Sequence, residues 1–403
     1  MASLLTSTEI TREALRILHQ KLNFVGNINR QYDDRFAKSG AKIGDTLSIR
    51  LPNQYTVRTG ATLSAGAAAA TNEQTVALQV ATQKGVDVSF TSQERTMKLD
   101  DFSQRILDPA MSVLAANIEA DALSMTKDIY QQVGVAGTPP TALANILAAG
   151  VKLDNALAPR DNNRNLLVTP QSQANLVSGL SGLFQDASTV GKQYRDGVMG
   201  RTAGFDWYAN TMADTMTNGT QVFTAAAISV APTEGGSTMT ITGTGTNVLK
   251  KGTVFTVSGC YECHHETKVA TGRLQQFVIS ADVTGSAGAF AVTFSPAVYA
   301  STTNGRQNVA QLPTTAMTVT SASGAASTAY QQNLAYHKDA FCFATADLIL
   351  PKGVDFAARE VMDGISMRIV QAYDINNDLF PCRIDVLYGY KTIRPQLACR
   401  ITE

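Results

Sequence analysis

One apolar stretch repeats with the period of a helix and is long enough to cross a whole domain. Its apolar residues are spaced three or four apart and share one helical face: Met111, Leu114, Ile118, Ala122, Met125 and Ile129. We expect a helix from Asp100 to about Gln132, with Asp100 and Asp101 at its start, where carboxylates accept free backbone N–H bonds. Pro109 predicts a kink or a short first helix, and Gly134 ends the pattern. At ~1.5 Å per residue this helix is roughly 30 Å or more long, enough to form the backbone of a domain.

Charge and composition exclude several classes of protein. The 403 residues, enough for two or three domains, carry 33 basic and 33 acidic side chains, a balance that disfavours tight nucleic-acid binding. We find neither eighteen consecutive apolar residues, which a membrane span needs, nor a signal peptide at the N-terminus. Five cysteines in so long a chain do not predict a disulfide scaffold. These features are typical of a soluble protein kept in a reducing cytoplasm.

The N-terminal region combines a short helix with a polar segment. Ile10, Ala14, Ile17 and Leu18 lie on one face of a helix expected to end near Asn23. Residues 27–44 are polar and irregular, so we interpret them as an extended arm rather than a packed element.

The period then changes to two. Leu47, Ile49 and Leu51 alternate with polar residues, and the same alternation returns at residues 76–80, which predicts a long β-ribbon. The connection is rich in Gly and Ala, too long for a hairpin turn and too bland for a core. Because an isolated ribbon is only marginally stable, we expect its tip to contact a partner surface. The residues expected to make that contact are Gly60, Ala61, Leu63, Gly66 and Asn72. A further strand, at residues 86–90, leads into the long helix.

The second half of the chain shows one domain inserted into another. Helical and strand patterns alternate over residues 135–221, which indicates an α+β fold. Residues 222–333 then hold nine charged side chains in 112 residues, against 57 in the other 291. Repeated alternating runs in this stretch, at residues 238–242, 254–257, 277–283, 289–294 and 317–320, predict an all-β barrel or sandwich. The α+β pattern resumes at residue 334.

This order of elements resembles the major capsid proteins of tailed phages, which have the Hong Kong 97 fold. In particular it is similar to the coat proteins of short-tailed phages that carry an inserted β-barrel domain. The resemblance covers essentially the whole chain and is carried by residues 194–206, residues 334–341, residues 348–353 and residues 388–395. It implies the following division: N-terminal arm, 1–44; E-loop and P-domain strands, 45–90; spine helix, 91–134; first part of the A-domain, 135–221; inserted β-barrel domain, 222–333; return of the A-domain and P-domain, 334–403.

The resemblance also implies a function. We expect a non-enzymatic subunit that assembles into hexamers and pentamers of an icosahedral capsid around double-stranded DNA, without sequence-specific binding and without a membrane. The implied partners are further copies of the chain, a scaffolding protein and a portal protein, with assembly in the host cytoplasm. The sequence starts at the arm helix, so we expect the scaffolding protein to be a separate chain. Lys84 and Asn72 flank the ribbon tip, but nothing in their pattern establishes the Lys–Asn cross-link of some relatives. An encapsulin-like protein compartment stays open as an alternative.

The segment Cys260-Tyr261-Glu262-Cys263-His264 is the strongest candidate for other chemistry. It fits the C-x-x-C-H pattern of c-type haem attachment, but that chemistry belongs to exported proteins. Zinc is the second alternative, with Cys260, Cys263, His264 and His265 as ligands, although a tetrahedral site usually draws ligands from two separated segments. We therefore expect loop cysteines with no metal and no cofactor, and a metal-binding or redox module is the alternative function of another class. His337 has no nucleophile in a recognisable setting, and we find neither a P-loop nor a complete dinucleotide loop.

Overall fold

In a computed structural model of the chain, the residues that can be described are 7–33, 46–55, 57, 61, 74–91, 106–180, 200–301, 305–322, 324–354, 356–362, 364–375 and 379–403. The described part forms two compact units. The first unit comprises Met1–Ile49, Thr75–Leu123 and Phe341–Ile393, and the second comprises Arg50–Gln74, Ser124–Ala340 and Arg394–Glu403. The expected α+β fold class is confirmed, because helices and sheets occur together and the charge-poor region contains a closed barrel.

The first unit is built on a six-stranded sheet whose order is β1-β19-β22-β21-β20, with β4 also paired to β22. Its strands are β1 (Asn29–Asp33), β4 (Thr82–Thr91), β19 (Phe341–Ala346), β20 (Phe356–Met362), β21 (Ile365–Gln371) and β22 (Leu379–Thr392). The pairing of β1 with β19 is parallel, and the other pairs are antiparallel. The long strand β22 therefore joins three neighbours into one layer.

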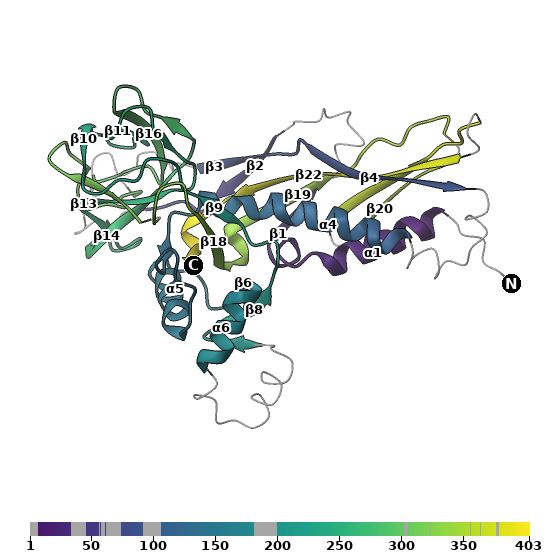
Figure 1. The fold of residues 1–403 in the computed structure, drawn as a ribbon, viewed down its shortest axis with the longest axis horizontal. Coiled ribbons are helices and arrows are strands. Elements are labelled where there is room, and N and C mark those ends of the chain that lie inside the picture. The colour runs from purple at the N-terminus through teal and green to yellow at the C-terminus, as the bar shows by residue number, and fades with distance from the viewer. Residues whose placement is uncertain are drawn as a thin grey trace. The chain divides into compact units, whose positions relative to one another are not determined.

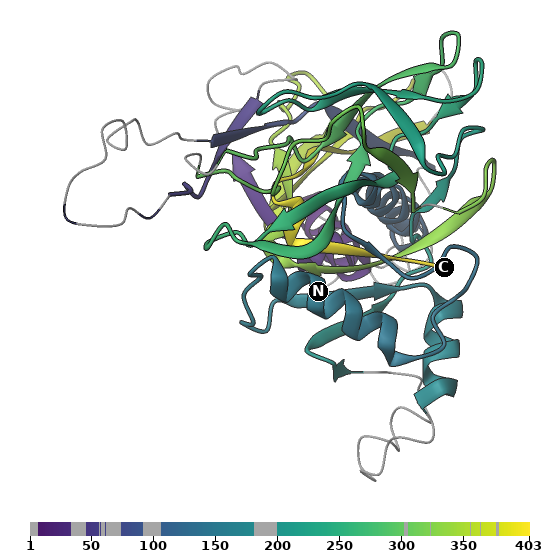
Figure 2. The same ribbon diagram turned by 90° about the vertical axis from the view of Figure 1, so that its left-hand side faces the viewer.

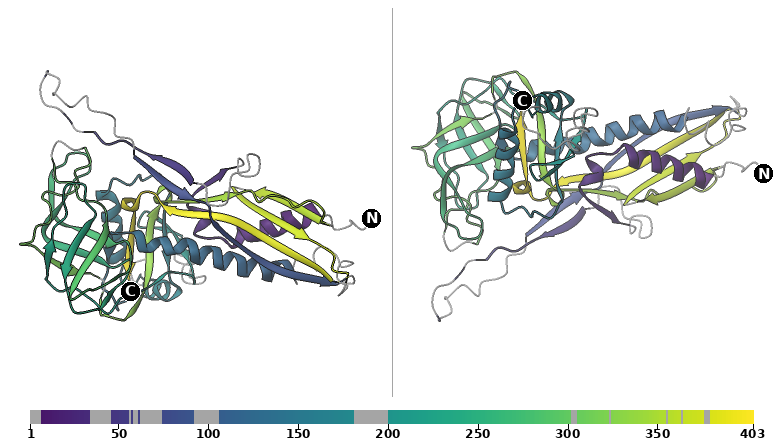
Figure 3. Two further views of the ribbon diagram at one scale, coloured as in Figure 1. Left: turned by 90° about the horizontal axis from the view of Figure 1, so that it is seen from above. Right: turned by 90° about the horizontal axis from the view of Figure 1, so that it is seen from below.

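Two helices cover one face of this sheet, α1 (Ser7–Lys21) and α4 (Asp108–Leu123) (Figure 3). All six apolar residues that defined the predicted helical face are buried. On α1, Ala14, Ile17 and Leu18 are buried, as their spacing predicts, and Leu15 is buried beside them, whereas Ile10 is only partly buried. A 3₁₀ turn, η1 (Val25–Asn27), follows α1 and leads into β1.

Two predictions about these elements are wrong. The long helix does not run to Gln132: α4 ends at Leu123, and the chain continues as a 3₁₀ helix, η4 (Ser124–Asp128), and a short strand, β5 (Gln132–Val133). The segment after residue 27 is not simply an extended arm, because Asn29–Asp33 forms β1. β1 is a polar edge strand, and its sequence lacks the apolar–polar alternation by which a half-buried strand is recognised. The strand forms because its backbone is hydrogen-bonded to β19. β20 was also missed, and Asp100 and Asp101 lie outside the described residues.

The second unit contains a seven-stranded sheet of order β5-β23-β18-β6-β8-β7, with β9 also paired to β18. Beyond β5 its strands are β6 (Arg164–Val168), β7 (Arg201–Thr202), β8 (Phe205–Ala209), β9 (Thr215–Thr217), β18 (Ala329–His337) and β23 (Ala398–Thr402). The helices are α5 (Leu143–Asn155) and α6 (Pro170–Leu180), with the 3₁₀ turns η5 (Lys338–Ala340) and η6 (Pro395–Leu397). Pro170 stands at the start of α6, a position where its missing N–H costs no helical hydrogen bond.

Between β9 and β18 the chain forms a closed six-stranded barrel of order β10-β11-β16-β14-β13-β17 (Figure 2). Its strands are β10 (Ala226–Val230), β11 (Thr238–Thr242), β13 (Val254–Cys263), β14 (Ala270–Ile279), β16 (Ala289–Ser295) and β17 (Thr318–Ser321), and β12 (Val248–Leu249) pairs with β15 (Val283–Thr284) beside them. The run predicted at residues 277–283 is in fact the end of β14 and the start of β15.

The barrel interior is filled by side chains. Phe255, Phe277 and Phe294 pack together with ring centroids 5.3 to 6.0 Å apart, and Phe223 meets Phe290 edge-on at 5.7 Å. These rings are buried, as the alternation in their strands predicts. The barrel is therefore a packed core rather than a ligand-binding cup.

Candidate functional site

The base of the β-ribbon is held by the core of the first unit. The ribbon consists of β2 (Thr46–Leu51) and β3 (Gln74–Gln79), which form their own two-stranded sheet (Figure 1). Leu78 and Val80 are fully buried in an apolar cluster with Cys342, Ala344 and Leu387. From β2, the inward residues Leu47 and Ile49 pack on the same cluster. The period-two pattern thus seats one face of the ribbon base on the sheet.

A glycine lets the ribbon cross the sheet at close range. Gly389 lies in the middle of β22, and a Cβ added there would collide with the carbonyl oxygen of Gln79 and stand 2.9 Å from the Cα of Val80. Since a side chain would force the two backbones apart, glycine is required by this crossing. A glycine inside a strand pattern is the sequence signal for such an approach, and it stands in the Tyr388-Gly389-Tyr390 segment.

The segment beyond the ribbon base exposes apolar side chains. Tyr55 is 69% exposed and Val57 is 95% exposed. Among the residues expected at the tip, Ala61 is described and exposed, whereas Gly60, Leu63, Gly66 and Asn72 lie outside the described residues. Large apolar side chains with this much exposure, on a chain segment without regular structure, are a candidate contact surface.

An ion pair ties the spine helix to the sheet beneath the ribbon. Asp121 on α4 accepts a 2.7 Å contact from the Lys84 ammonium and a 2.5 Å hydrogen bond from the Tyr388 hydroxyl. Burial, followed by the hydrogen bond to Asp121, raises the pKa of Tyr388 above its ordinary value, so the phenol stays protonated and donating. Lys84, considered above for a cross-link, is therefore engaged with Asp121 inside the first unit.

A second set of charges lies on β21 and β22 of the same sheet. The fully buried Asp385 accepts bonds from Arg368 at 2.7 Å and from Arg383 at 2.9 Å. Arg368 also donates to the carbonyl of Ile349 at 2.7 Å, and Arg359 donates to that of Leu348 at 3.2 Å. Arg359 on β20 and Arg368 on β21 thus hold the backbone of Leu348 and Ile349 against these strands. The side chain of Ile349 is 63% exposed.

In the second unit a buried polar network surrounds the start of α6. Thr169 caps the helix by accepting the N–H of Ser172 at 3.1 Å, and its hydroxyl donates to the Glu403 carboxylate at 2.8 Å. Ser172 also donates to that carboxylate, and Asn333 accepts the N–H of Thr169 at 2.7 Å. A carboxylate at a helix N-terminus is favoured by the helix dipole, so this cluster has a structural explanation.

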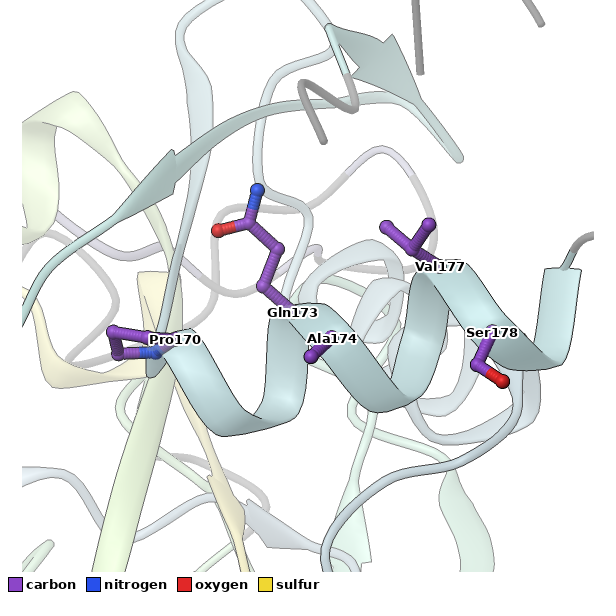
Figure 4. A pocket seen from close by; sticks show the side chains of 5 residues that line it. All are labelled: Pro170, Gln173, Ala174, Val177 and Ser178. Carbon is purple, nitrogen blue, oxygen red and sulfur yellow. The ribbon is translucent and has the colours of Figure 1, made fainter. Parts of the chain in front are cut away.

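A shallow hollow of about 420 Å³ lies along α6 (Figure 4). It is lined by Pro170, Gln173, Ala174, Val177 and Ser178. The five described residues that line it include no acid and no base among their side chains.

The cysteines of the C-x-x-C-H segment do not lie in a loop, as predicted, but on β13. Cys260 is fully buried and Cys263 is 5% exposed. The positive φ of Gly259 (76°) and a shift in the β13–β14 register accompany this inward placement of residues three apart. Burial raises the pKa of Cys260 to about 12, which keeps it a thiol. The expectation of exposed loop cysteines is therefore wrong, because a bulge cannot be read from spacing alone.

His264 and His265 follow these cysteines and lie in different surroundings. The Nδ1 atom of His264 accepts the N–H groups of Glu266 and Thr267 at 3.3 and 3.2 Å, so it caps its own turn. Burial lowers the pKa of His265, which keeps it neutral. Among the residues that the structure describes, no three His, Cys, Asp or Glu side chains converge as a metal site would require.

His337 also has a structural role. Its Nδ1 atom accepts the N–H of Asp339 at 3.2 Å, so Nε2 carries the proton and donates it to Asp161 at 3.0 Å. Hydrogen bonds from Asn163 and then from His337 hold the pKa of Asp161 below its usual range. The buried ring is thus occupied on both sides.

The barrel is joined to the sheet of the second unit by polar contacts that sequence reasoning missed. The side chain of Gln276 bonds the backbone of Gln132 in both directions, at 3.0 and 3.1 Å, and therefore mimics a strand partner. Lys251 pairs with Asp128 at 2.8 Å. The buried Arg400 donates to the carbonyl of Gly252 at 2.8 Å. Neutral residues such as Gln132 and Gln276 carry no periodic signal, so their pairing emerges from the fold.

The chain is similar to one known protein family and to several solved structures. Residues 27–400 match the family model described as "P22 coat protein - gene protein 5". Similar solved structures include one of Mycobacterium phage Che8, with 13% identity, a TM-score of 0.45, and coverage of 94% of this chain and 90% of that one. The capsid of Ralstonia phage GP4 has 10% identity, a TM-score of 0.45, and coverage of 94% and 88%. The mature capsid of bacteriophage PhiM1 has 12% identity, a TM-score of 0.41, and coverage of 94% and 86%.

No curated protein sequence matches the chain. None of the described helices is long and apolar enough to cross a membrane. Because the family match extends over nearly the whole sequence, the chain belongs to the P22 coat protein family and is a major capsid protein, a subunit that forms the phage shell.

Proposed function

We propose that copies of this coat protein assemble into the hexamers and pentamers of an icosahedral shell that encloses double-stranded DNA. The observation that carries the proposal is the β-ribbon: its base is fixed in an apolar core, while Tyr55 and Val57 beyond it expose apolar surface. Such a surface is stabilised when a neighbouring subunit covers it, and identical contacts repeated under symmetry close a shell. Within this shell the role of each subunit is geometric, and the family suggests a structural rather than an enzymatic role.

The division of the chain supports the same proposal. We assign residues 1–44 to the arm, 45–90 to the ribbon and its strands, 91–134 to the spine, 222–333 to the inserted barrel, and the remainder to the A-domain and its return. The closed barrel between β9 and β18 supports the assignment of residues 222–333. Residues Gly60, Ala61, Leu63, Gly66 and Asn72 are assigned to contacts with a neighbouring subunit.

We further assign three partners beyond the coat protein itself. A scaffolding protein guides assembly in the host cytoplasm, a portal protein occupies one vertex, and the DNA inside is held without sequence preference. The balance of 33 basic and 33 acidic residues suits a wall that does not bind DNA tightly at fixed sites. That the protein is a subunit of the virion follows from its family alone, without any of these partners.

The test is assembly of ribbon variants, measured by electron microscopy and sedimentation. Deletion of residues 61–70, or the double change Tyr55→Ser and Val57→Ser, is expected to leave the thermal unfolding of dispersed subunits nearly unchanged while shells fail or weaken. Val230→Ser is the matched control, because Val230 is also an exposed valine, 59% accessible, but lies on β10 of the barrel.

Normal particles from both ribbon variants would refute the contact role of the ribbon. A subunit that no longer folds after the deletion would show instead that the tip belongs to the core of its own subunit. Purified particles also decide between a phage shell and an encapsulin-like compartment, because the latter would contain protein cargo in place of DNA.

A further inference from the structure

Two described stretches of one barrel loop, residues 297–301 and 305–309, are held by hydrogen bonds to the barrel body and to each other. Glu234 accepts the N–H groups of Ala300 and Ser301 at 3.0 and 3.1 Å. The side chain of Asn308 donates to the carbonyl of Ala297 at 2.7 Å and accepts the N–H of Tyr299 at 2.9 Å. Backbone and side-chain groups are thereby paired, so the start of the loop is fixed in position.

The end of the loop is held as well. The Arg306 guanidinium lies 5.8 Å from the centre of the Tyr299 ring, and it donates to the Tyr299 hydroxyl at 3.4 Å. Gln307 is buried and donates to the carbonyl of Ala300 at 3.3 Å. Gly305 immediately precedes these anchored residues, so its backbone has little freedom to move relative to the barrel.

Gly305 lies directly against the backbone that continues from β2. A Cβ placed on Gly305 would be 2.6 Å from the carbonyl oxygen of Gln54, 3.0 Å from its carbonyl carbon and 3.3 Å from the nitrogen of Tyr55. All three neighbours are backbone atoms, which cannot rotate away as the end of a side chain could. Gly305 does not have a positive φ, so the loop itself would accept an alanine. The need for glycine at this position therefore comes from the ribbon segment and not from the conformation of the loop.

We propose that the inserted barrel positions the ribbon segment after β2, with residues 297–301 and 305–309 of one barrel loop forming a seat for the backbone of Gln54 and Tyr55, against which Gly305 lies. Pro52 stiffens the segment before the seat. The backbone of Tyr55 lies in the seat while its side chain is exposed, and the side chain of Val57, two residues further along, is exposed as well. The proposal rests on the proposed function in so far as it treats this segment as the part of the chain that contacts a neighbouring subunit. It gives the inserted barrel a role within its own subunit: a rigid support that limits where the ribbon points.

The distances from Gly305 to the backbone of Gln54 show how far an added side chain would displace the ribbon segment. Ordinary van der Waals contact begins at 3.4 Å, whereas the added methyl of alanine would start 2.6 Å from the Gln54 oxygen. Either the loop or the ribbon segment must give way, and the bonds of Glu234 and Asn308 restrain the loop. Gly305→Ala is therefore expected to displace the ribbon segment, and Gly305→Val to displace it further.

The experiment uses the full-length, unassembled subunit and two local measurements. The first is the rate of trypsin cleavage at Arg50 and Arg58, which flank the seat in the sequence. The second is amide hydrogen exchange over residues 52–57. For Gly305→Val we expect both rates to rise about fivefold or more, which corresponds to about 1 kcal/mol of local opening free energy. The thermal unfolding of the barrel is expected to stay within the range of an ordinary surface change.

Two further variants complete the test. Gly26→Ala is the matched control, because a Cβ at Gly26 meets nothing within 4 Å and Gly26 has no positive φ, and it is expected to change neither rate. Glu234→Ala loosens the loop without adding bulk to it, and is expected to raise exchange over residues 52–57 as well. If Gly305→Val fails to fold, Gly305→Ala and Glu234→Ala carry the test. Unchanged cleavage and exchange in the folded Gly305 variants and in Glu234→Ala would overturn the proposal.

These measurements do not depend on assembly. If the seat variants release the ribbon segment and shells still form normally, the seat exists and the contact role of the ribbon fails. If shells depend on Tyr55 and Val57 but the seat variants change neither rate, the proposed function holds and the barrel does not position the ribbon.

Discussion

The carboxylate of Glu119 provides a direct test of how the segment after α1 is fixed to the spine helix. Glu119 is 3% exposed and accepts the backbone N–H groups of Phe24 and Val25, each at 3.1 Å. Both donors belong to fully buried residues, and the ring of Phe24 packs edge-on against Phe341 at 5.4 Å. Removing the acceptor therefore leaves two buried N–H groups that water cannot readily reach.

The expected magnitude follows from these two bonds. A hydrogen bond to a charged group contributes about 1.5–3 kcal/mol, and an unsatisfied buried donor costs about 1–3 kcal/mol. Glu119→Gln keeps one acceptor oxygen but turns an NH₂ group toward the second N–H, so we expect a loss of about 1.5–3 kcal/mol in the free energy of unfolding. Glu119→Ala removes both acceptors, and we expect about 3–5 kcal/mol, because the loss of a buried charge offsets part of the penalty.

Urea unfolding of dispersed subunits measures these differences, and amide exchange at Phe24 and Val25 locates them. Glu13→Gln is the control on α1: it also converts a glutamate to a glutamine, but Glu13 forms an ion pair with the exposed Arg16, and exposed pairs contribute little. A Glu119→Gln variant that unfolds at the same urea concentration as the wild type, with unchanged exchange at both amides, would show that the carboxylate does not restrain this segment.

Three further changes test other parts of the structure. Gly389→Ala should cost about 1–3 kcal/mol through collision with Gln79, and a wild-type urea midpoint would contradict the close crossing. Cys260→Ser places a hydroxyl in the barrel core and should lower stability by about 1–3 kcal/mol in thermal unfolding, whereas no loss would mean that the side chain is accessible. Hydrogen bonds from Arg160 and then Arg164 lower the pKa of Asp154 in the folded protein. The ionised carboxylate therefore stabilises the fold above the unfolded pKa of about 3.9, and this stabilisation is lost as the pH falls through the lower folded pKa. Asp154→Asn should therefore flatten the acid side of the stability profile, and identical profiles would refute this.

Local patterns were enough to predict the main elements. The helical spacing from Met111 to Ile129 identified buried positions correctly, because a side chain on one helical face has the same environment every three or four residues. The alternation with a period of two at Leu47, Leu78 and the barrel strands predicted the inward-facing residues for the same reason. The drop in charged residues after residue 222 coincides with the start of the barrel, whose first strand is β10.

The ends of elements and the polar contacts depended on distant partners. α4 stops at Leu123 and Gln132 joins a strand, where the side chain of Gln276, 144 residues away, satisfies its backbone. β1 is a strand because β19 lies beside it, although its own sequence shows no alternation. Hydrogen bonds of this kind form between whatever groups the fold brings together, and composition does not record them.

The candidate site shows the same division. By itself the sequence determined that a ribbon exists, that one face of its base is apolar, and that its far end is poor in core-forming residues. Only the tertiary structure decided that Gly389 is the crossing point, that Cys260 and Cys263 face inward, and that Gly305 meets Gln54. The physical reason is that periodic burial is a local property of the chain, whereas a close approach of two backbones depends on where the rest of the fold places them.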